Sequence, residues 1–386
     1  MKFSQAHRIS EIQPPIIPII HKLISENPET ISLGQGVVYY GPPKKIAAGI
    51  SEFFSKKTNH RYGLVSGIPE LKYLLQSKLE IENKITLNDE CQLVVTAGSN
   101  MGFMNALLSI TDQGDEIILF SPYYFNHEMA IRIANCHPVI VKTDNDFQIN
   151  FEAIKKAINK NTKAIVSISP NNPTGAVYPS TDLILLNQLC ADRGIYHIHD
   201  EAYEYFSYEK DHFSPGSIPD SKNHTISLFS LSKSYGFAGW RIGYMVIPAN
   251  IYEAVSKIQD TILICPTMIS QYAAASILQV GSDYCIEKRK KIEFSRNIVL
   301  KELKKIEGLC KPFQASGAFY IFLQIESPLN SMQLTKELIC QYKVAVLPGT
   351  AFGVEGCSIR LSYGALSLPE IKNGIKRLVN GIIKLT

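Results

Sequence analysis

Two patterns of hydrophobic and polar positions alternate through the middle of the chain. Short apolar runs rich in β-branched and aromatic residues are separated by stretches with helical spacing. This alternation is typical of βαβ units, in which successive strands run parallel and helices cover the sheet. The apolar runs predict seven strands, at Gln92–Thr96, Glu116–Phe120, Pro138–Val141, Lys163–Ser169, Ile195–His199, Thr225–Leu231 and Gly243–Ile247.

The pattern changes after about Gln271, where long charged helices begin. Further strands are predicted at Phe319–Gln324, Val344–Leu347 and Ser358–Ser362, followed by a last helix. We therefore expect an α/β protein with a seven-stranded, mostly parallel sheet in a large domain of residues 46–272, and a smaller α+β domain. The smaller domain comprises residues 1–45 and 273–386, and its proline-rich N-terminal part, to about residue 45, is expected to be an irregular arm and loop.

Composition adds limits on what kind of protein this is. The 386 residues are 45% hydrophobic, which is enough for a large core in one to three domains. The net charge of +4 is spread along the chain, and the densest basic run, Lys288–Lys291, lies in a helical pattern with acidic neighbours. That run favours a solvated helix face over a nucleic-acid-binding surface.

The cysteines and the apolar stretches indicate the environment of the protein. Eight cysteines are scattered without a CxxC pair, which favours reduced, mostly buried thiols and a cytoplasmic location. The N-terminal apolar stretch is interrupted by Pro14, Pro15 and Pro18, so it does not resemble a signal peptide. No apolar run reaches the length needed to span a membrane, so we expect no membrane association.

Candidate chemistry follows the predicted strands. After Thr96, the sequence Gly98, Ser99 and Asn100 predicts a turn into a helix whose first amides can bind a phosphate; an ordinary capped glycine turn is the alternative. After Phe120 come two tyrosines, of which Tyr124 can either cover a planar ring or pack in the core.

The next strands are followed by amides, a carboxylate and a phenol. PNNPTG offers the side-chain amide of Asn172 as a donor, although the same sequence also forms a plain turn. DEAYEY places Asp200 at a strand end, where it can either hold a proton on a ring nitrogen or cap a helix, with Tyr203 three residues later.

The strongest candidate is Lys233, just past the carboxyl end of a predicted strand and next to Ser230 and Ser232. A desolvated lysine at that edge has a lowered pKa and can attack a carbonyl carbon. Arg241, eight positions later, has a planar fork that suits a phosphate dianion. Taken alone, a solvated loop lysine and a surface arginine are the simpler interpretations. Together with the preceding motifs at one edge of one sheet, they predict a binding site.

Other classes of site fit the residues less well. His197 and His199 form an H-x-H pair that can bind a metal, but both point into a sheet that helices should cover, so core packing is favoured and no metal site is predicted. The glycines Gly34, Gly36 and Gly41 lack the spacing and the preceding strand of a dinucleotide motif. A non-enzymatic cofactor-binding regulator would need an added DNA-binding domain, for which there is no room before Ile31.

The motifs SPNNPTG, DEAY, SLSKSYGFAGWRIGY and SIRLSYG occur in this order, and with them the chain resembles the class I/II aminotransferases over nearly its whole length. These belong to the aspartate-aminotransferase-like branch of fold-type I enzymes, which use pyridoxal 5′-phosphate. The resemblance implies a ping-pong transfer of an α-amino group between an L-amino acid and a 2-oxo acid through Schiff bases. A lyase, such as a C–S β-lyase, uses almost the same residues and remains the alternative.

The resemblance also implies a role for each site residue. Lys233 would carry the cofactor and move the proton, while Asp200 would pair with the ring nitrogen, and Tyr203 and Asn172 would bond the 3-oxygen. Arg360, with Asn172 and a backbone group near Gly36, would take the substrate carboxylate. The remaining residues would hold the phosphate or the ring, namely Gly98, Ser99, Asn100, Ser230 and Arg241 for the phosphate, Tyr124 for the ring and Tyr62 for the phosphate of the partner subunit in a homodimer.

The substrate side chain is less closely defined by motifs. Tyr39 and Tyr40 follow an LGQG stretch that is similar to the glutamine and kynurenine transaminase branch. They suit an aromatic or apolar side chain, or they pack the arm against the body of the protein. The sequence therefore predicts a neutral or aromatic amino-acid donor.

Overall fold

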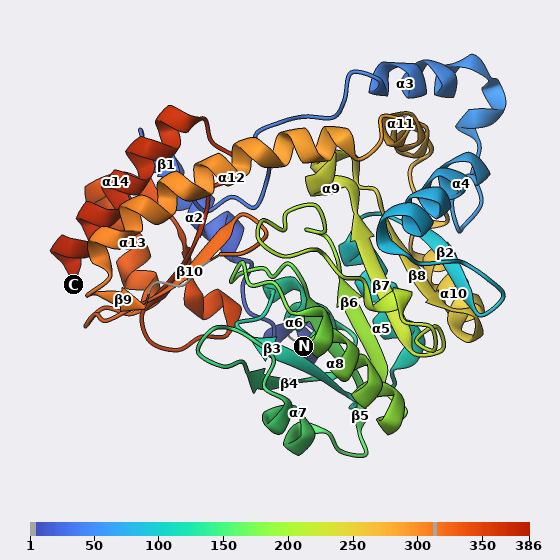
Figure 1. Cartoon of the computed structure of the whole chain (residues 1–386), viewed down its shortest axis with the longest axis horizontal. Coiled ribbons are helices and arrows are strands. Elements are labelled where there is room, and N and C mark those ends of the chain that lie inside the picture. Colours follow the sequence, from blue (N-terminus) through green and yellow to red (C-terminus); the bar gives the residue numbers. More distant parts are fainter. Residues whose placement is uncertain (1–4, 312–314) are drawn as a thin grey trace, which may run out of the picture.

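Seven strands form the central sheet of the computed structural model, which describes residues 5–311 and 315–386 (Figure 1). The strand order is β2-β8-β7-β6-β5-β3-β4, and only β8 runs antiparallel to its neighbours. The predicted seven-stranded, mostly parallel sheet is thereby confirmed. The strands are β2 (Cys91–Thr96), β3 (Glu116–Ser121), β4 (His137–Lys142), β5 (Thr162–Ile168), β6 (Tyr196–Asp200), β7 (Thr225–Ser230) and β8 (Gly243–Pro248).

Helices cover both faces of this sheet because side chains alternate between the faces along each strand. In β2, Val94 packs in one apolar cluster with α5 and α10, whereas Leu93 and Val95 pack in another with α4 and α11. A third cluster joins α7 and α8 to the other end of the sheet. The helices of this part are α3 (Ile46–Ser55), α4 (Pro69–Lys78), α5 (Ser99–Ile110), α6 (Phe125–Ile133), α7 (Phe151–Ala157), α8 (Ser180–Arg193), α9 (Leu231–Ser234), α10 (Tyr252–Leu263) and α11 (Met268–Leu278).

A second, four-stranded antiparallel sheet lies beside the C-terminal helices in the order β12-β13-β10-β9. The last helix packs on it with buried residues spaced three and four apart, such as Ile371, Ile375 and Leu378. The long helix α12 reaches from this part towards the large sheet (Figure 1). The elements are β9 (Cys310–Lys311), β10 (Tyr320–Ile325), β12 (Leu347–Pro348), β13 (Ser358–Ser362), α12 (Asp283–Leu303), α13 (Ser331–Tyr342) and α14 (Leu368–Leu385).

The single strand predicted at residues 344–347 is wrong in detail. The segment divides into β11 (Val344–Ala345), which pairs in parallel with β1 (Ile31–Ser32), and β12, which pairs with β13. One apolar run thus contributes strands to two sheets. The spacing of its apolar residues does not indicate where the run divides.

The N-terminal region is also more regular than predicted, because residues 16–25 form helix α2, preceded by the short helix α1 (His7–Ser10). Pro18 is the third residue of α2, where a backbone N–H has no partner within the helix, so the proline costs no hydrogen bond there. Ile16 and Ile20 of α2 pack against Leu347 and Phe352 of the smaller sheet region.

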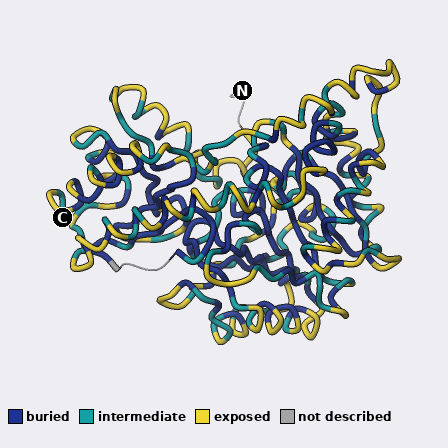
Figure 2. Tube along the Cα trace, turned by 45° about the horizontal axis from the view of Figure 1, so that its top comes forward, coloured by how far each residue is buried: buried dark blue, intermediate teal, exposed yellow. Residues whose placement is uncertain are grey.

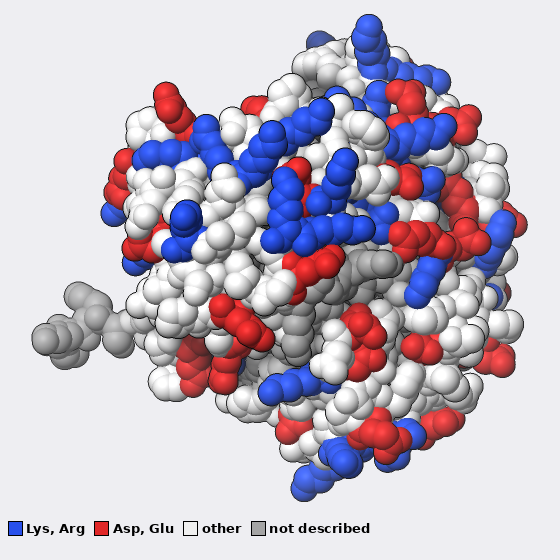
Figure 3. Space-filling model, turned by 60° about the vertical axis from the view of Figure 1, so that its left-hand side comes forward, with Lys and Arg blue, Asp and Glu red and all other residues white. Residues whose placement is uncertain are grey.

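Burial and charge follow the same division into core and surface. Buried residues trace the strands and the inner sides of the helices, and exposed residues follow the outer turns (Figure 2). On the face shown in Figure 3, Lys and Arg side chains gather mainly in the upper half, with Asp and Glu side chains among them. Among the described residues, no helix combines the length and the apolar character needed to cross a membrane.

Candidate active site

The carboxyl ends of the parallel strands open onto a cavity of about 490 Å³. Eleven of the thirteen residues to which the family resemblance gave a role lie on its wall, whereas the substrate-side candidates Tyr39 and Tyr40 do not. The eleven are Gly36, Ser99, Asn100, Tyr124, Asn172, Asp200, Tyr203, Ser230, Lys233, Arg241 and Arg360. Of the other two, Gly98 lies behind the wall against Arg241, and Tyr62 is 80% exposed on the surface.

Lys233 lies on the short helix α9 that directly follows β7, and its Nζ donates a hydrogen bond to the carbonyl of Gly36 at 2.6 Å. Burial, together with the nearby charges of Arg241 and Arg360, lowers the pKa of Lys233 to about 8. The Tyr40 hydroxyl donates to the Lys233 carbonyl at 2.8 Å, which fixes the turn that carries the lysine. The amine is therefore part neutral near pH 8 and can act as a nucleophile.

Asp200 is the last residue of β6 and has two partners. Its Oδ1 accepts from the backbone N–H of Ala202 at 3.0 Å, and its Oδ2 lies 3.2 Å from Nε2 of His127. The His127 ring stacks on Phe103 with centroids 4.0 Å apart, so it is held rigidly. This arrangement keeps the carboxylate buried yet oriented towards the cavity.

Arg360 is a buried arginine of β13 that forms no ion pair with any described carboxylate. Its Nη1 donates to Oδ1 of Asn172 at 2.9 Å and its Nη2 to the carbonyl of Gly34 at 2.8 Å, while its Nε has no partner among the described residues. The guanidinium carbon lies 4.3 Å from the ring centre of Tyr320. Burying a cation without a counter-ion is costly, so the site suits an incoming anion such as a carboxylate.

A group of hydrogen-bond donors lines the cavity where helix α5 begins. Gly98 precedes the helix with φ of 83°, and Arg241 approaches so closely that a Cβ at Gly98 would lie 2.4 Å from its Nη2. A Cβ at Gly243 would lie 2.7 Å from the backbone N of Ser99. Helix amides, the Ser230 hydroxyl and a guanidinium together fit a phosphate.

Tyr124 precedes helix α6 and also lines the cavity. Its hydroxyl accepts from Nδ2 of Asn126 at 2.8 Å, and its ring meets the His127 ring edge to face at 5.1 Å. The exposed part of the ring is thus available to cover a planar group. A phosphate site, a buried carboxylate and a lysine with a lowered pKa, all on the wall of one cavity, fit a pyridine aldehyde phosphate.

Tyr203 forms the centre of a smaller contact group. Its hydroxyl lies 2.8 Å from the Tyr320 hydroxyl and 3.5 Å from Nδ2 of Asn172. Burial raises the pKa of Tyr203 well above its ordinary value, so the phenol keeps its proton. It is therefore a hydrogen-bond donor over the whole neutral range.

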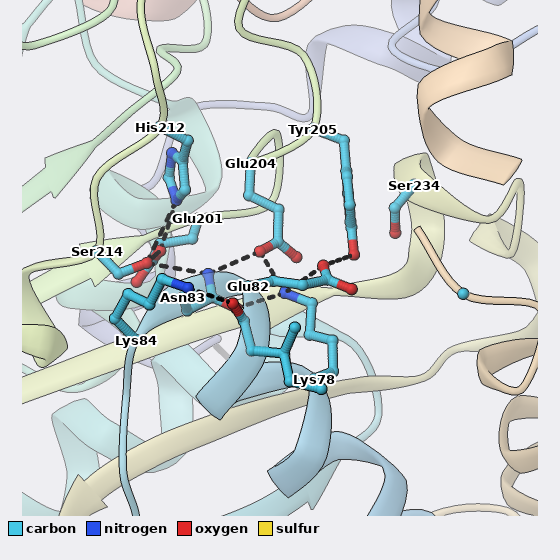
Figure 4. A network of polar contacts seen from close by, with 12 residues as sticks. Lys78, Glu82, Asn83, Lys84, Glu201, Glu204, Tyr205, His212, Ser214 and Ser234 are labelled. Carbon is cyan, nitrogen blue, oxygen red and sulfur yellow. Dashed lines mark hydrogen bonds and ion pairs between the residues drawn. The ribbon is translucent and has the colours of Figure 1, made fainter. Parts of the chain in front are cut away.

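A buried polar cluster anchors the turn that follows β6 and carries Tyr203 (Figure 4). Lys78, at the end of α4, pairs with Glu204 and donates to Oδ1 of Asn83 at 2.7 Å. Glu201, on the same turn, contacts Nε2 of His212 at 2.7 Å. Lys78 and Asn83 are five positions apart, and the chain between them forms a π-helix (Leu79–Asn83), whose hydrogen bonds join residues at that spacing.

Three residues of the site were missed by sequence reasoning. His127 supports Asp200, Tyr320 contacts Tyr203, and Gly34 accepts from Arg360. His127 follows Tyr124 by one helical turn, and this i, i+3 spacing is a signal that could have placed it at the site. Tyr320 has no such signal, because its strand belongs to the other sheet.

The H-x-H pair on β6 lies in the interior, as core packing requires. Both rings are fully buried and contact the Ser167 hydroxyl, His197 through Nε2 at 2.7 Å and His199 through Nδ1 at 2.6 Å. Burial lowers the pKa of both residues. They are neutral side chains of the sheet core and do not line the cavity.

Comparison with known proteins gives consistent results. A family model described as aminotransferase class I and II matches residues 28–378. The chain is 37% identical to a probable aspartate/prephenate aminotransferase of Aquifex aeolicus, over 98% of each chain, and 32% identical to an aromatic aminotransferase of Arabidopsis thaliana, over 96% and 94%. Among solved structures, a Thermus thermophilus aspartate aminotransferase with maleate superposes with a TM-score of 0.90 at 29% identity, covering 98% of this chain and 100% of that one.

Proposed function

The chain belongs to the class I and II aminotransferases, and from this we infer that it holds pyridoxal 5′-phosphate on Lys233 while it transfers α-amino groups between amino acids and 2-oxo acids. The observation that carries the assignment is a lysine amine with a pKa of about 8 between two sites for anions. Arg241 and the start of α5 form one site, and the unpaired Arg360 forms the other. This arrangement suits a cofactor phosphate on one side and a substrate carboxylate on the other.

The wall residues divide into groups that hold different parts of the cofactor. Ser99, Asn100, Ser230 and Arg241 would bind the phosphate, and Gly98 allows Arg241 to approach. The remaining ring contacts would come from Asp200 at the ring nitrogen, Tyr203 and Asn172 at the 3-oxygen, and Tyr124 over the ring face.

When bound, the cofactor supplies an aldehyde that condenses with amines and a protonated ring that accepts the electrons left by a departing α-proton. Lys233 would take that proton from the substrate α-carbon and deliver it to a carbon of the cofactor. Asp200, supported by His127, would hold the proton on the ring nitrogen, because a buried carboxylate favours a cationic partner. Arg360 would orient the substrate through its carboxylate, so that the α-carbon faces Lys233.

The assignment is tested by borohydride reduction of the purified protein, followed by peptide mapping. We expect the label on Lys233 and expect it to be lost in Lys233→Ala, whereas the surface variant Lys84→Met retains it. A label on another lysine, or none, contradicts the proposal.

Transfer is favoured over elimination because the curated relatives compared above are named aminotransferases. Incubation with methionine and 2-oxoglutarate should yield glutamate, with ping-pong kinetics. A C–S β-lyase would form no glutamate from methionine, whose sulfur is on the γ-carbon. From cysteine it would release sulfide, pyruvate and ammonia without consuming 2-oxoglutarate.

We further propose a neutral or aromatic donor. One wall of the cavity is formed by apolar side chains of α2 and its surroundings, namely Ile16, Ile17, Ile20, Phe125 and Leu347. Among the described residues, no lysine or arginine other than Lys233, Arg241 and Arg360 lines the cavity. A panel of donors should rank phenylalanine, methionine and glutamine ahead of aspartate, and a strong lead for aspartate contradicts this choice.

The chain is also proposed to act as a homodimer, in which Tyr62 reaches the phosphate of the partner subunit. Its 80% exposure in the single chain is compatible with a contact made only on assembly. We propose the same division into domains as the sequence predicts, with residues 46–272 as the large domain and residues 1–45 and 273–386 as the small one. In support, the two sheets share no strand.

A further inference from the structure

Tyr320, on strand β10 of the smaller sheet, places its hydroxyl between three parts of the cavity wall. The hydroxyl lies 2.8 Å from that of Tyr203, on the turn after β6 of the large sheet. The third part is the N-terminal segment at Gly36. A Cβ at Gly36 would lie only 2.6 Å from the Tyr320 hydroxyl oxygen, so glycine is required there. Tyr320 is fully buried, which fixes this position.

The hydrogen atoms of this contact can be counted. Each phenol carries one proton, so within the pair one hydroxyl donates and the other accepts. Asn172 also donates towards the Tyr203 oxygen, at 3.5 Å. If the Tyr203 hydroxyl donated its hydrogen bond to Tyr320, it could not donate one to a group in the cavity. If Tyr320 donates, Tyr203 accepts from two sides and keeps its own proton for the cavity.

The direction of the hydrogen bond between the two phenols therefore decides whether Tyr203 can donate a hydrogen bond into the cavity. Burial raises the pKa of Tyr320 to about 12 and that of Tyr203 well above its ordinary value, so both phenols remain protonated. A phenol that accepts a hydrogen bond is also a stronger donor, because hydrogen bonds in a chain polarise one another.

We propose that Tyr320 is a positioning residue for the reaction, whose hydroxyl donates to Tyr203 and so directs the single proton of Tyr203 to the 3-oxygen of the cofactor. This inference rests on the proposed function. It assigns a role to a residue of the smaller sheet region that does not itself have to touch the cofactor.

The ring of Tyr320 has a separate task. The Arg360 guanidinium lies over it at 4.3 Å, and this contact depends on the ring face, not on the hydroxyl. Removing only the hydroxyl therefore separates the two tasks. Substrate binding through Arg360 should change little, whereas the chemistry that depends on Tyr203 should slow down.

The experiment uses the cofactor-loaded enzyme with Tyr320→Phe, Tyr203→Phe and the double variant. The first readout is the pH midpoint of the absorption change of the bound cofactor. We expect Tyr320→Phe to raise this midpoint by about half a pH unit, because a weaker donor leaves more negative charge on the 3-oxygen, which then holds the neighbouring proton more strongly. Tyr203→Phe should raise it further, and the double variant should match Tyr203→Phe alone.

The second readout is steady-state kinetics, in which kcat of Tyr320→Phe should fall about 3- to 10-fold while KM for the amino acid stays within about twofold. The control is Tyr244→Phe, which removes another buried hydroxyl, one without a partner among the described residues, and should leave both readouts unchanged.

Two results would overturn the inference. One is a midpoint for Tyr320→Phe equal to that of the Tyr244→Phe control, and the other is a Tyr320→Phe shift that persists in full when Tyr203 is already Phe. Failure of the proposed function would look different, since the unmodified protein would then show no cofactor absorption and no transamination at all.

Discussion

At the scale of single residues, a buried arginine and a partly buried lysine face one cavity without a carboxylate bonded to either. Arg360 donates two hydrogen bonds to the neutral oxygens of Asn172 and Gly34, and Lys233 donates one to the carbonyl of Gly36. Neutral partners satisfy the geometry of a cation but not its charge. The free energy that this leaves uncompensated is available for binding anions.

Arg360→Lys should lower kcat/KM at least about 30-fold, because the planar fork that matches a carboxylate is lost and a desolvated charge contact is worth about 2 kcal/mol or more. The measurement is steady-state kinetics over a range of amino-acid concentrations, in which KM should carry most of the loss. Arg193→Lys, an exposed arginine on α8, is the control and should change kcat/KM less than twofold. A loss confined to kcat would contradict the assigned carboxylate contact.

The lowered pKa of Lys233 makes stability depend on pH. Between the folded value of about 8 and the ordinary value of 10.5, the unfolded chain binds more protons, so stability rises as pH rises through that window. In cofactor-free protein, the difference in unfolding free energy between the natural chain and Lys233→Met should move in favour of the natural chain by about 2 kcal/mol from pH 7.5 to 9.5. Urea unfolding at both pH values measures it, and a difference that does not change with pH would show that the lysine is not desolvated.

At the scale of elements, the site depends on how strands end and helices begin. Gly98 has φ of 83° and ψ of 164°, a region of backbone space that is almost restricted to glycine. It lets α5 start directly beside Arg241. The turn after β6 is held by the cluster around Lys78 (Figure 4). The start of α5 and this turn, which both carry residues of the cavity wall, are thus each fixed by a structural device of their own.

Gly98→Ala should cost about 1–3 kcal/mol of stability through backbone strain. It should also weaken cofactor binding, because the new Cβ would lie 2.4 Å from Nη2 of Arg241. Gly239→Ala is the matched control, since no atom lies within 4 Å of its Cβ position and its φ is not positive. Cofactor titration and urea unfolding measure the two effects, and equal behaviour of both variants would contradict a phosphate site at the start of α5.

Lys78→Met should destabilise the fold by about 3–5 kcal/mol, because it leaves the buried carboxylate of Glu204 and the partly exposed one of Glu82 without their cation. Lys84→Met, six residues further along, removes an exposed lysine that bonds only a carbonyl and should cost less than about 0.5 kcal/mol. Adding Glu204→Gln to Lys78→Met should recover part of the loss. If Lys78→Met unfolds at the same urea concentration as Lys84→Met, the cluster does not anchor the turn.

At the scale of the whole molecule, one surface of the chain exposes several large apolar side chains. Phe54, Tyr62 and Leu64 are 62%, 80% and 59% exposed, and the backbone N–H of Gly63 contacts the Cys265 thiol at 3.3 Å. That contact places residues 62–64 beside the end of α10, where Ile262 and Ile264 are also exposed. An apolar patch of this kind is typical of an interface between proteins.

The patch should be covered in a homodimer, which sedimentation would detect as about twice the 43.1 kDa of one chain. Leu64→Glu should shift the population towards the single chain and lower activity in parallel, since Tyr62 would no longer reach the other subunit. Leu185→Glu, an exposed leucine on α8, should leave the assembly intact. An active protein that sediments as a single chain would contradict the dimer.

The sequence by itself determined the architecture of the large sheet and the edge where chemistry would gather. Alternating strand and helix periods fix which residues face the core, and motifs placed directly after strands must meet at the carboxyl end of a parallel sheet. For that reason Ser99, Asn172, Asp200 and Lys233 were all found on one cavity wall. The helical nature of residues 16–25 was missed because prolines outweighed a short amphipathic pattern.

Only the tertiary structure decided which side chains from distant elements meet there. Tyr320 and Arg360 come from the smaller sheet, and its packing against the large sheet brings them to Tyr203 and Asn172. The pairing of His127 with Asp200 likewise joins a helix to a strand that is not adjacent to it in the chain. Local periodicity encodes which face of an element is buried, but it does not encode the contacts between elements, which depend on how whole elements pack.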